Sequence, residues 1–258
     1  MKKDISFPDG AILVIGGTGG IGSEVVKIFA ECGCPVIFTY KNNNSKAEEL
    51  VNECSSNSKV FNFKLDIIDS KQVSFVIEEI IGKFNRIHTI INCAGFDIDQ
   101  KIISELSAES FNEVMQSDVQ GFFNIVNSTL GHLSEKGGSY IFMSSAGLLK
   151  YPPGDILSVA PKAAIEQLIK GIAKEEGANN IRANSIALGI VDAGIFHRLK
   201  DQNDSFFDED WESELMNALP LKRYASPREV AELTLFLASN EAGYITGQMI
   251  AIDGGYSI

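Results

Sequence analysis

Three glycines near the start of the chain, Gly16, Gly20 and Gly22, have the spacing to bind a phosphate. They follow a short apolar run at residues 11–15, which is typical of a strand buried on both faces of a parallel sheet. Glycine lets the chain turn sharply there and lets a pyrophosphate approach bare backbone at the N-terminus of the next helix. Because glycine also marks ordinary turns, the strand, helix and second strand around the motif supply its specificity.

The elements that must position this turn follow from the spacing of apolar residues. Strands are predicted at residues 11–15, 35–40, 60–65, 87–91, 139–143, 181–187 and 248–252. Helices are predicted between them, from Ile21, after the turn at 42–45, after Ser70, and at 111–133, 165–172 and 227–238. This alternation predicts an α/β fold, a Rossmann-like doubly wound sheet of seven parallel strands flanked by helices, with ligands at the carboxyl ends of the strands.

Composition predicts one domain over residues 1–258, because 45% of the residues are hydrophobic and no linker-like stretch divides them. The net charge of −12 argues against nucleic acid and anionic membrane as partners. No apolar run approaches the ~20 residues of a membrane span, and no secretory signal is evident. The four cysteines lack metal-type spacing, so we expect no metal site and a cytoplasmic location; Cys32 and Cys34 are expected to be buried small residues, with a redox pair as the alternative.

The order of these motifs resembles the short-chain dehydrogenase/reductase family, in particular the branch that contains β-ketoacyl carrier-protein reductases. The family's cofactor turn is similar to GGTGGIG at 16–22, and its Asn-Asn-Ala-Gly segment is similar to NCAG at 92–95. Later landmarks resemble the segments at 181–186, 227–231 and 245–255. The resemblance runs from about residue 10 to the C-terminus and implies an oxidoreductase that uses a nicotinamide nucleotide.

The end of the second strand favours NADP(H) over NAD(H). NAD sites of this kind place an acidic residue there, whereas this chain has Tyr40 followed by Lys41. Lys41 can pair with a 2′-phosphate, although it could also be a solvated surface lysine, so NAD(H) stays open. By resemblance, Asp66 accepts from the adenine amino group and Asn92 lines the cleft. The full set of implied nucleotide contacts is Gly16, Thr18, Gly20, Ile21, Gly22, Tyr40, Lys41, Asp66, Asn92, Ala94, Gly95, Lys162, Gly189, Ile190 and Asp192.

The resemblance also implies a catalytic set with an altered member. The family uses a serine that orients the carbonyl, a tyrosine that donates a proton, and a lysine four residues later that lowers the pKa of the tyrosine. Here Ser145 and Lys162 match the serine and the lysine, and Ser158 stands at the tyrosine position. An aliphatic hydroxyl is a far weaker acid than a phenol of pKa ~10, so we expect ordinary ketone reduction to be impaired.

Other residues near this motif leave alternatives open. Pro161 would be harmless in the first turn of a helix, so Ser158 could be the N-cap instead of a catalytic group. Asp118 stands where the family has a relay asparagine; beside Lys162 it could form a buried ion pair, or titrate and protonate substrate through a water. Tyr151 could swing in as a substitute phenol or be an ordinary loop tyrosine. The family's 2,4-dienoyl-CoA reductases also carry serine at the tyrosine position.

Residues 190–220 are expected to form a substrate lid. Seven acids lie within 201–214, together with Phe206, Phe207 and Trp211, which predicts an acidic helix with an aromatic face toward the core. Such a lid would repel coenzyme A or an acidic carrier protein. The leading hypothesis is an NADP(H)-dependent oxidoreductase acting on a carbonyl or conjugated enone or enoyl substrate with an altered proton donor. The alternatives are a nucleotide-binding pseudo-enzyme or partner subunit without redox turnover, and a non-redox dehydratase or isomerase that uses Asp118.

The expected partners are a small-molecule substrate and further copies of the same chain. The long apolar helices predicted at 111–133 and 155–177 correspond to surfaces that relatives use for dimer contacts. By resemblance, a homodimer or homotetramer is expected.

Overall fold

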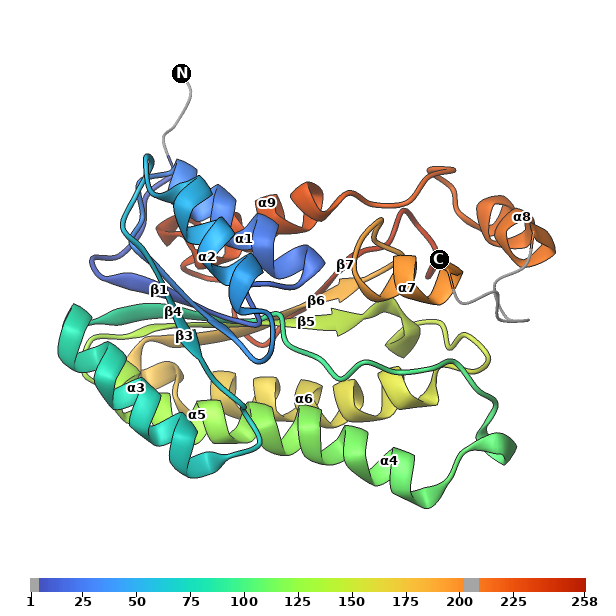
Figure 1. The fold of residues 1–258 in the computed structure, drawn as a ribbon, viewed down its shortest axis with the longest axis horizontal. Coiled ribbons are helices and arrows are strands. Elements are labelled where there is room, and N and C mark those ends of the chain that lie inside the picture. Colours follow the sequence, from blue (N-terminus) through green and yellow to red (C-terminus); the bar gives the residue numbers. More distant parts are fainter. Residues whose placement is uncertain (1–4, 202–208) are drawn as a thin grey trace.

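The computed structural model describes residues 5–201 and 209–258 and contains one parallel sheet (Figure 1). Its seven strands are β1 (Ala11–Ile15), β2 (Val36–Tyr40), β3 (Val60–Lys64), β4 (Ile87–Asn92), β5 (Gly138–Ser145), β6 (Ile181–Leu188) and β7 (Met249–Ile252). They lie in the order β3-β2-β1-β4-β5-β6-β7, and every neighbouring pair is parallel. The predicted doubly wound seven-stranded sheet is therefore confirmed.

The strand order changes direction at β1. The chain builds outward from β1 to β3 and then crosses back to place β4 on the other side of β1, where Ile15 and Asn92 are register partners at the strand ends. In open sheets of this kind, ligands bind in the crevice outside the carboxyl ends of the strands at this switch point. The crevice between the ends of β1 and β4 is thus where the fold places a ligand.

Helices cover both faces of the sheet (Figure 1). One face carries α1 (Gly20–Glu31), α2 (Asn44–Cys54) and α9 (Pro227–Ala238), and the other carries α3 (Ser70–Phe84), α5 (Gly121–Ser134) and α6 (Ile156–Glu175). Alternate side chains of β1 enter the two cores: Ile12 and Val14 pack on the first face, and Leu13 and Ile15 on the second. Burial on both faces explains why the strands read as continuous apolar runs.

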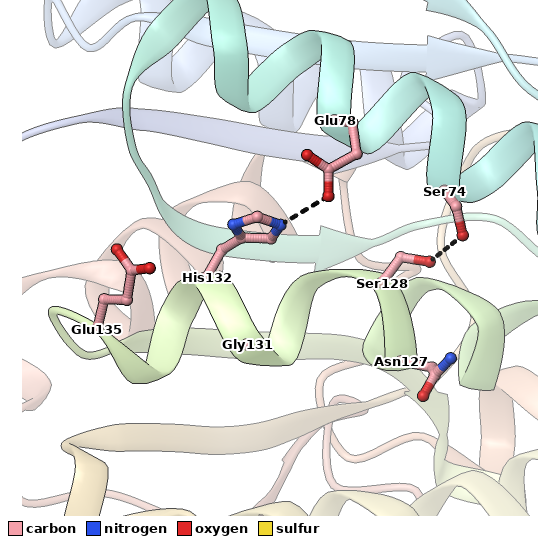
Figure 2. Close-up of a pocket in the computed structure, with 7 residues that line it drawn as sticks. All are labelled: Ser74, Glu78, Asn127, Ser128, Gly131, His132 and Glu135. Carbon is pink, nitrogen blue, oxygen red and sulfur yellow. Dashed lines mark hydrogen bonds and ion pairs between the residues drawn. The ribbon is translucent and has the colours of Figure 1, made fainter.

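Two polar contacts join α3 to α5 at their exposed edge (Figure 2). The hydroxyls of Ser74 and Ser128 lie 3.2 Å apart, and Nε2 of His132 lies 3.2 Å from Oε1 of Glu78. An open groove lies here. Because α5 leads back to the start of β5, this groove lies near the amino ends of the strands, away from the crevice. His132 is a partly exposed surface residue.

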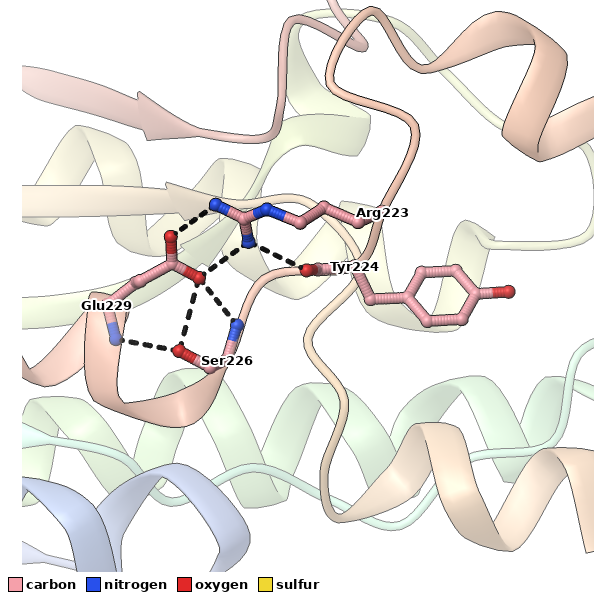
Figure 3. A network of polar contacts seen from close by, with 4 residues as sticks. All are labelled: Arg223, Tyr224, Ser226 and Glu229. Carbon is pink, nitrogen blue, oxygen red and sulfur yellow. Dashed lines mark hydrogen bonds and ion pairs between the residues drawn. The ribbon is translucent and has the colours of Figure 1, made fainter.

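The helix predicted at 227–238 is found with the same bounds, and its N-terminus shows why (Figure 3). The Ser226 hydroxyl accepts from the Glu229 N–H at 3.3 Å, and the Glu229 carboxylate accepts from the Ser226 N–H at 2.8 Å. Pro227 occupies the first turn, where its missing N–H costs nothing. Arg223 also binds both carboxylate oxygens of Glu229 and lowers the pKa of that residue to about 2.

The helix predicted at 111–133 is interrupted. It consists of α4 (Ala108–Val114) and α5, joined by the π-helical turn η2 (Met115–Gln120), which carries Asp118. A π-helical turn holds one more residue than an α-helical turn, and such turns are frequent at functional sites. Apolar periodicity alone does not reveal it.

The segment after β6 contains α7 (Ile195–Asp201) and α8 (Glu209–Ala218). The aromatic lid face expected from Phe206, Phe207 and Trp211 lies outside the described side chains. The remaining helical turns are η1 (Ile103–Glu105), η3 (Ala146–Leu148), η4 (Gly177–Asn179) and η5 (Asn240–Ala242).

The cysteines are free thiols in the structure. Cys34 is buried as expected, but the same expectation is wrong for Cys32, which is exposed because it follows the last turn of α1. Across the described part of the chain, the helices are too short or too polar to span a bilayer. Among the side chains that the structure describes, no three from His, Cys, Asp or Glu gather to hold a metal ion.

Candidate active site

The turn between β1 and α1 brings the backbone close to any ligand in the crevice. Gly16 has a φ of +78°, and a Cβ there would lie 2.9 Å from the backbone of Ala94. A Cβ on Gly22 would collide with the carbonyl oxygen of Gly16. Within the described residues, no side chain caps α1 at Gly19, so its first N–H groups face the crevice without a capping side chain. Thr18 and Ile21 lie on the same turn.

The ends of β2 and β3 bring together two of the predicted nucleotide contacts. Nζ of Lys41 lies 2.9 Å from Oδ2 of Asp66, whose Oδ1 accepts from the Ile68 N–H at 3.2 Å. Tyr40 is buried, and its hydroxyl donates to Oδ1 of Asn44 in α2 at 2.5 Å. Lys41 and Asp66 are therefore exposed at the crevice, whereas the Tyr40 hydroxyl is engaged by α2.

The end of β4 carries an unsatisfied acceptor. Asn92 is buried, and its Oδ1 has no hydrogen-bond partner in the described part of the chain. Its Nδ2 donates to the Ala94 carbonyl at 3.4 Å, beside Gly95. A buried polar atom without a partner is rare and indicates a missing ligand atom or water.

The loop after β6 closes the crevice from the other side. A Cβ on Gly20 would lie 2.8 Å from Cβ of Ala193, so this loop lies directly against the start of α1. Gly189 and Ile190 precede it. Oδ1 of Asp192 lies 2.7 Å from Nε2 of His197, so its carboxylate is held by a neighbouring imidazole. The bare glycine turn, the uncapped α1 and the orphaned Asn92 oxygen together fit a dinucleotide.

Three of the predicted catalytic residues gather where β5 meets α6. Ser145 ends β5, and its Oγ accepts from the Gly147 N–H at 3.0 Å. Lys162 donates from Nζ to Oγ of Ser158 at 3.1 Å and to the Ser158 carbonyl at 3.4 Å. A Cβ on Gly147 would lie 2.8 Å from Val159, so the turn after Ser145 packs on the first turn of α6.

The interpretation of Ser158 as a helix cap is wrong. The N-cap of α6 is Asp155, and Ser158 is the third helical residue. Pro161 therefore lies in the interior of the helix, where it cannot donate to the Leu157 carbonyl. The Ser158 hydroxyl is available to the site instead, and Lys162 is its neighbour.

Asp118 reaches the site from the π-helical turn. Its Oδ1 accepts from the Phe96 N–H at 2.8 Å. Burial raises the pKa of Asp118, while Lys162 and the Phe96 N–H act in the opposite direction. Of the two alternatives for Asp118, the direct ion pair is not formed, since no salt bridge within 4.0 Å joins Asp118 and Lys162, both described here. Burial lowers the pKa of Lys162, and the charges of Asp118 and Asp155 oppose that shift.

Sequence reasoning missed Asp155 and Tyr256. Asp155 is buried beside Lys162 and accepts from Nε2 of Gln100 at 3.3 Å. Burial raises its pKa to about 6 against the opposing effects of Lys162, Gln100 and Ser158. Burial and the charge of Asp155 raise the pKa of Tyr256. An acid three residues before Ser158 was the available signal, but an acid at that place is typical of a helix cap.

Tyr151, the other phenol considered, has 47% of its surface exposed in the loop before α6. Lys150 instead contacts the C-terminal tyrosine, donating from Nζ to the Tyr256 carbonyl at 3.0 Å. Its Nζ also lies 4.8 Å from the centre of the Tyr256 ring.

The fold and this crevice define a Rossmann-like α/β protein, and comparison with known proteins specifies its family. A family model described as Enoyl-(Acyl carrier protein) reductase matches residues 16–257. The 3-oxoacyl-(acyl-carrier-protein) reductase FabG of Thermotoga maritima is 30% identical over 248 residues, covering 95% of this chain and 97% of that protein. FabG of Chlamydia muridarum is 31% identical over 249 residues, covering 95% and 96%. This chain belongs to the short-chain dehydrogenase/reductase family.

Solved structures agree with this assignment. A short-chain dehydrogenase/reductase from Serratia marcescens superimposes with a TM-score of 0.86 at 27% identity, covering 98% of this chain and 99% of that one. A short-chain type dehydrogenase/reductase from Mycobacterium ulcerans gives a TM-score of 0.90 at 24% identity, which supports the fold.

Proposed function

We propose that the protein is an NADP(H)-dependent oxidoreductase that reduces a carbonyl or a conjugated enone or enoyl group of a small molecule, with a proton donor other than the family's phenol. The observation that carries this proposal is the hydrogen bond from Lys162 to Ser158, beside Ser145 and the dinucleotide crevice. Relatives described as 3-oxoacyl carrier-protein reductases, and a matching family model described as an enoyl carrier-protein reductase, support the choice of these substrate groups. The net charge of −12 disfavours an acidic carrier protein as the bound form of the substrate.

The residues present divide the work of such a reduction. A bound reduced nicotinamide nucleotide supplies the hydride. Ser145 orients the substrate oxygen by a hydrogen bond, and the Lys162 ammonium stabilises the negative charge that develops there. Because Lys162 donates to Ser158 Oγ, the Ser158 hydroxyl hydrogen is directed away from the ammonium and is available to another acceptor.

The cofactor preference rests on Lys41. The ion pair of Lys41 with Asp66, which follows β3, supports a position of the ammonium beside the crevice. A 2′-phosphate offers the Lys41 ammonium a stronger partner than one carboxylate does. The end of β2 is Tyr40 instead of an acidic residue, so no carboxylate at that position repels the phosphate. NADP(H) is the cofactor that this arrangement favours.

The test begins with titration of NADPH and NADH by nicotinamide fluorescence and continues with NADPH oxidation against ketones, enones and thioesters. We expect tighter binding of NADPH and turnover of at least one class. Ser158→Tyr should raise ketone reduction by restoring the phenol, whereas Ser145→Ala should abolish turnover of every class. Bound NADPH without turnover would indicate a partner subunit, and product formed without NADPH consumption would indicate a dehydratase or isomerase.

A further inference from the structure

The helix α7, which follows the loop after β6, has few apolar contacts. It is seven residues long, and among its described side chains only Leu199 is buried. Phe196 adds one edge-to-face contact, with 4.8 Å between the centres of its ring and the Tyr224 ring. A helix this short is not stable alone and depends on contacts with the rest of the molecule. The polar contacts of α7 therefore have a large part in holding it in place.

The basic side chains of α7 supply these polar contacts. Nε2 of His197 lies 2.7 Å from Oδ1 of Asp192, which precedes the helix by three residues. Nζ of Lys200 lies 2.9 Å from Oε1 of Glu212, which belongs to α8. Among the ion pairs that the described residues of α7 make, those of Arg198 are the ones that join the helix to the loop after β4.

Arg198 engages three groups in that loop. Its Nε lies 2.7 Å from Oδ1 of Asp97, and its Nη1 donates to Oδ1 of Asp99 at 3.3 Å. Its Nη2 donates to the carbonyl oxygen of Ile98. A single exposed ion pair contributes little to stability, but one planar guanidinium that engages two carboxylates and a carbonyl forms a network of defined geometry.

The segments that Arg198 joins lie on different sides of the crevice. The loop before α7 packs on the start of α1, since a Cβ on Gly20 would lie 2.8 Å from Cβ of Ala193. The loop after β4 contacts the catalytic groups, since the Phe96 N–H donates to Oδ1 of Asp118 at 2.8 Å. Figure 1 shows α7 at the carboxyl ends of β5 and β6. Arg198 therefore connects the nucleotide side of the crevice to its catalytic side.

We propose that Arg198 is a positioning residue that holds α7 closed over the crevice by an ion-pair latch with Asp97 and Asp99; this inference rests on the proposed function. The ion pairs break when substrate enters or product leaves, and they form again to exclude water while the substrate is bound. Arg198 itself does not touch the reacting atoms. Because Asp97 and Asp99 have 65% and 53% of their side chains exposed, added salt weakens the latch.

The first test measures amide hydrogen exchange of residues 195–200 by mass spectrometry, without nucleotide or substrate. Arg198→Gln should speed this exchange by about 10-fold, because opening of α7 becomes more frequent. Salt at about 0.5 M should speed it in the unmodified protein and have little effect in Arg198→Gln. Arg228→Gln is the matched control, since Arg228 binds both carboxylate oxygens of Glu31, at 3.0 and 2.6 Å, at the end of α1 remote from the crevice. That variant should leave the exchange unchanged.

The second test uses the kinetics of NADPH-dependent reduction. Arg198→Gln should raise the KM for the substrate by about 5-fold and change kcat by less than about 2-fold, because the latch retains the substrate and takes no part in the chemistry. Arg228→Gln should change neither constant. A double variant, Asp97→Asn with Asp99→Asn, removes the partners of Arg198. In that background Arg198→Gln should have no further effect on exchange or on KM, because the interaction is already lost.

Equal exchange of residues 195–200 in Arg198→Gln and in the unmodified protein would overturn the latch. A full effect of Arg198→Gln in the background that lacks both carboxylates would also overturn it. A protein that binds NADPH but reduces none of the ketones, enones and thioesters would overturn the proposed function. The exchange measurement needs no turnover, so it would decide the latch separately.

Discussion

Lys41 is the residue that we expect to distinguish NADPH from NADH, which lacks the 2′-phosphate. Its ammonium lies 2.9 Å from Asp66, and 55% of its side-chain surface is exposed, so a 2′-phosphate can replace the carboxylate as its partner. We expect Lys41→Gln to weaken NADPH binding by about 10-fold, or ~1.4 kcal/mol, and to leave NADH binding unchanged. The measurement is fluorescence titration of both nucleotides.

Lys46→Gln is the matched control for this change. Lys46 is an exposed lysine in α2, so its replacement alters the net charge equally without touching the end of β2. NADPH affinity should therefore stay the same in that variant. An equal loss of NADPH and NADH binding in Lys41→Gln would show that the lysine holds a part common to both nucleotides.

The sequence predicts which residues belong to this site, but it does not predict the hydrogen-bond partners of those residues. Ser145, Ser158 and Lys162 follow from a linear motif, and the structure brings them together. The partner of Asp155 could not be predicted, because its carboxylate accepts from Gln100, which is 55 residues away in the chain. An aspartate just before a helix suits either a capping bond or a contact with a distant side chain, and only the tertiary neighbours decide between them.

At the scale of the element, predicted bounds are accurate where local chemistry determines them. The capping box of Ser226 and Glu229 gives α9 its start at Pro227. Pro161 misleads for α6, since the helix begins at Ile156 and carries the proline in its interior. Packing of η3 on the first turn of α6 outweighs the proline's unfavourable helix propensity.

The role of the β1–α1 turn can be tested by substitution, because a side chain at its glycines would collide with neighbouring atoms. A Cβ on Gly22 would collide with the Gly16 carbonyl, whereas a Cβ on Gly82, in α3, would meet no atom within 4 Å among the described residues. We expect Gly22→Ala to lower the free energy of unfolding by about 1–3 kcal/mol and to abolish NADPH binding. Gly82→Ala should raise that free energy by about 0.5–1 kcal/mol through helix propensity. Urea unfolding and nucleotide titration measure both, and an unchanged NADPH affinity in Gly22→Ala would contradict the assignment of the turn.

At the scale of the whole molecule, the alternation of strands and helices was sufficient to predict the sheet and its two covered faces. The same alternation does not predict which outer helix surfaces contact other protein molecules. Phe111 of α4 and Phe123 of α5 have 39% and 46% of their surfaces exposed on a protein with a net charge of −12. Singly exposed apolar side chains are ordinary, but these two lie on the helices that, by resemblance to the family, correspond to dimer-contact surfaces.

We therefore expect a homodimer that buries the outer face of α4 and α5. Phe123→Glu should weaken self-association by a factor on the order of 100, because a charge replaces an aromatic side chain in the contact. Phe75→Glu is the matched control, since Phe75 is 71% exposed but lies on α3. Sedimentation velocity over a range of protein concentrations distinguishes the two variants. Dissociation by Phe75→Glu but not by Phe123→Glu would move the interface to α3, and an unmodified protein that stays monomeric would show that this apolar face serves a different partner.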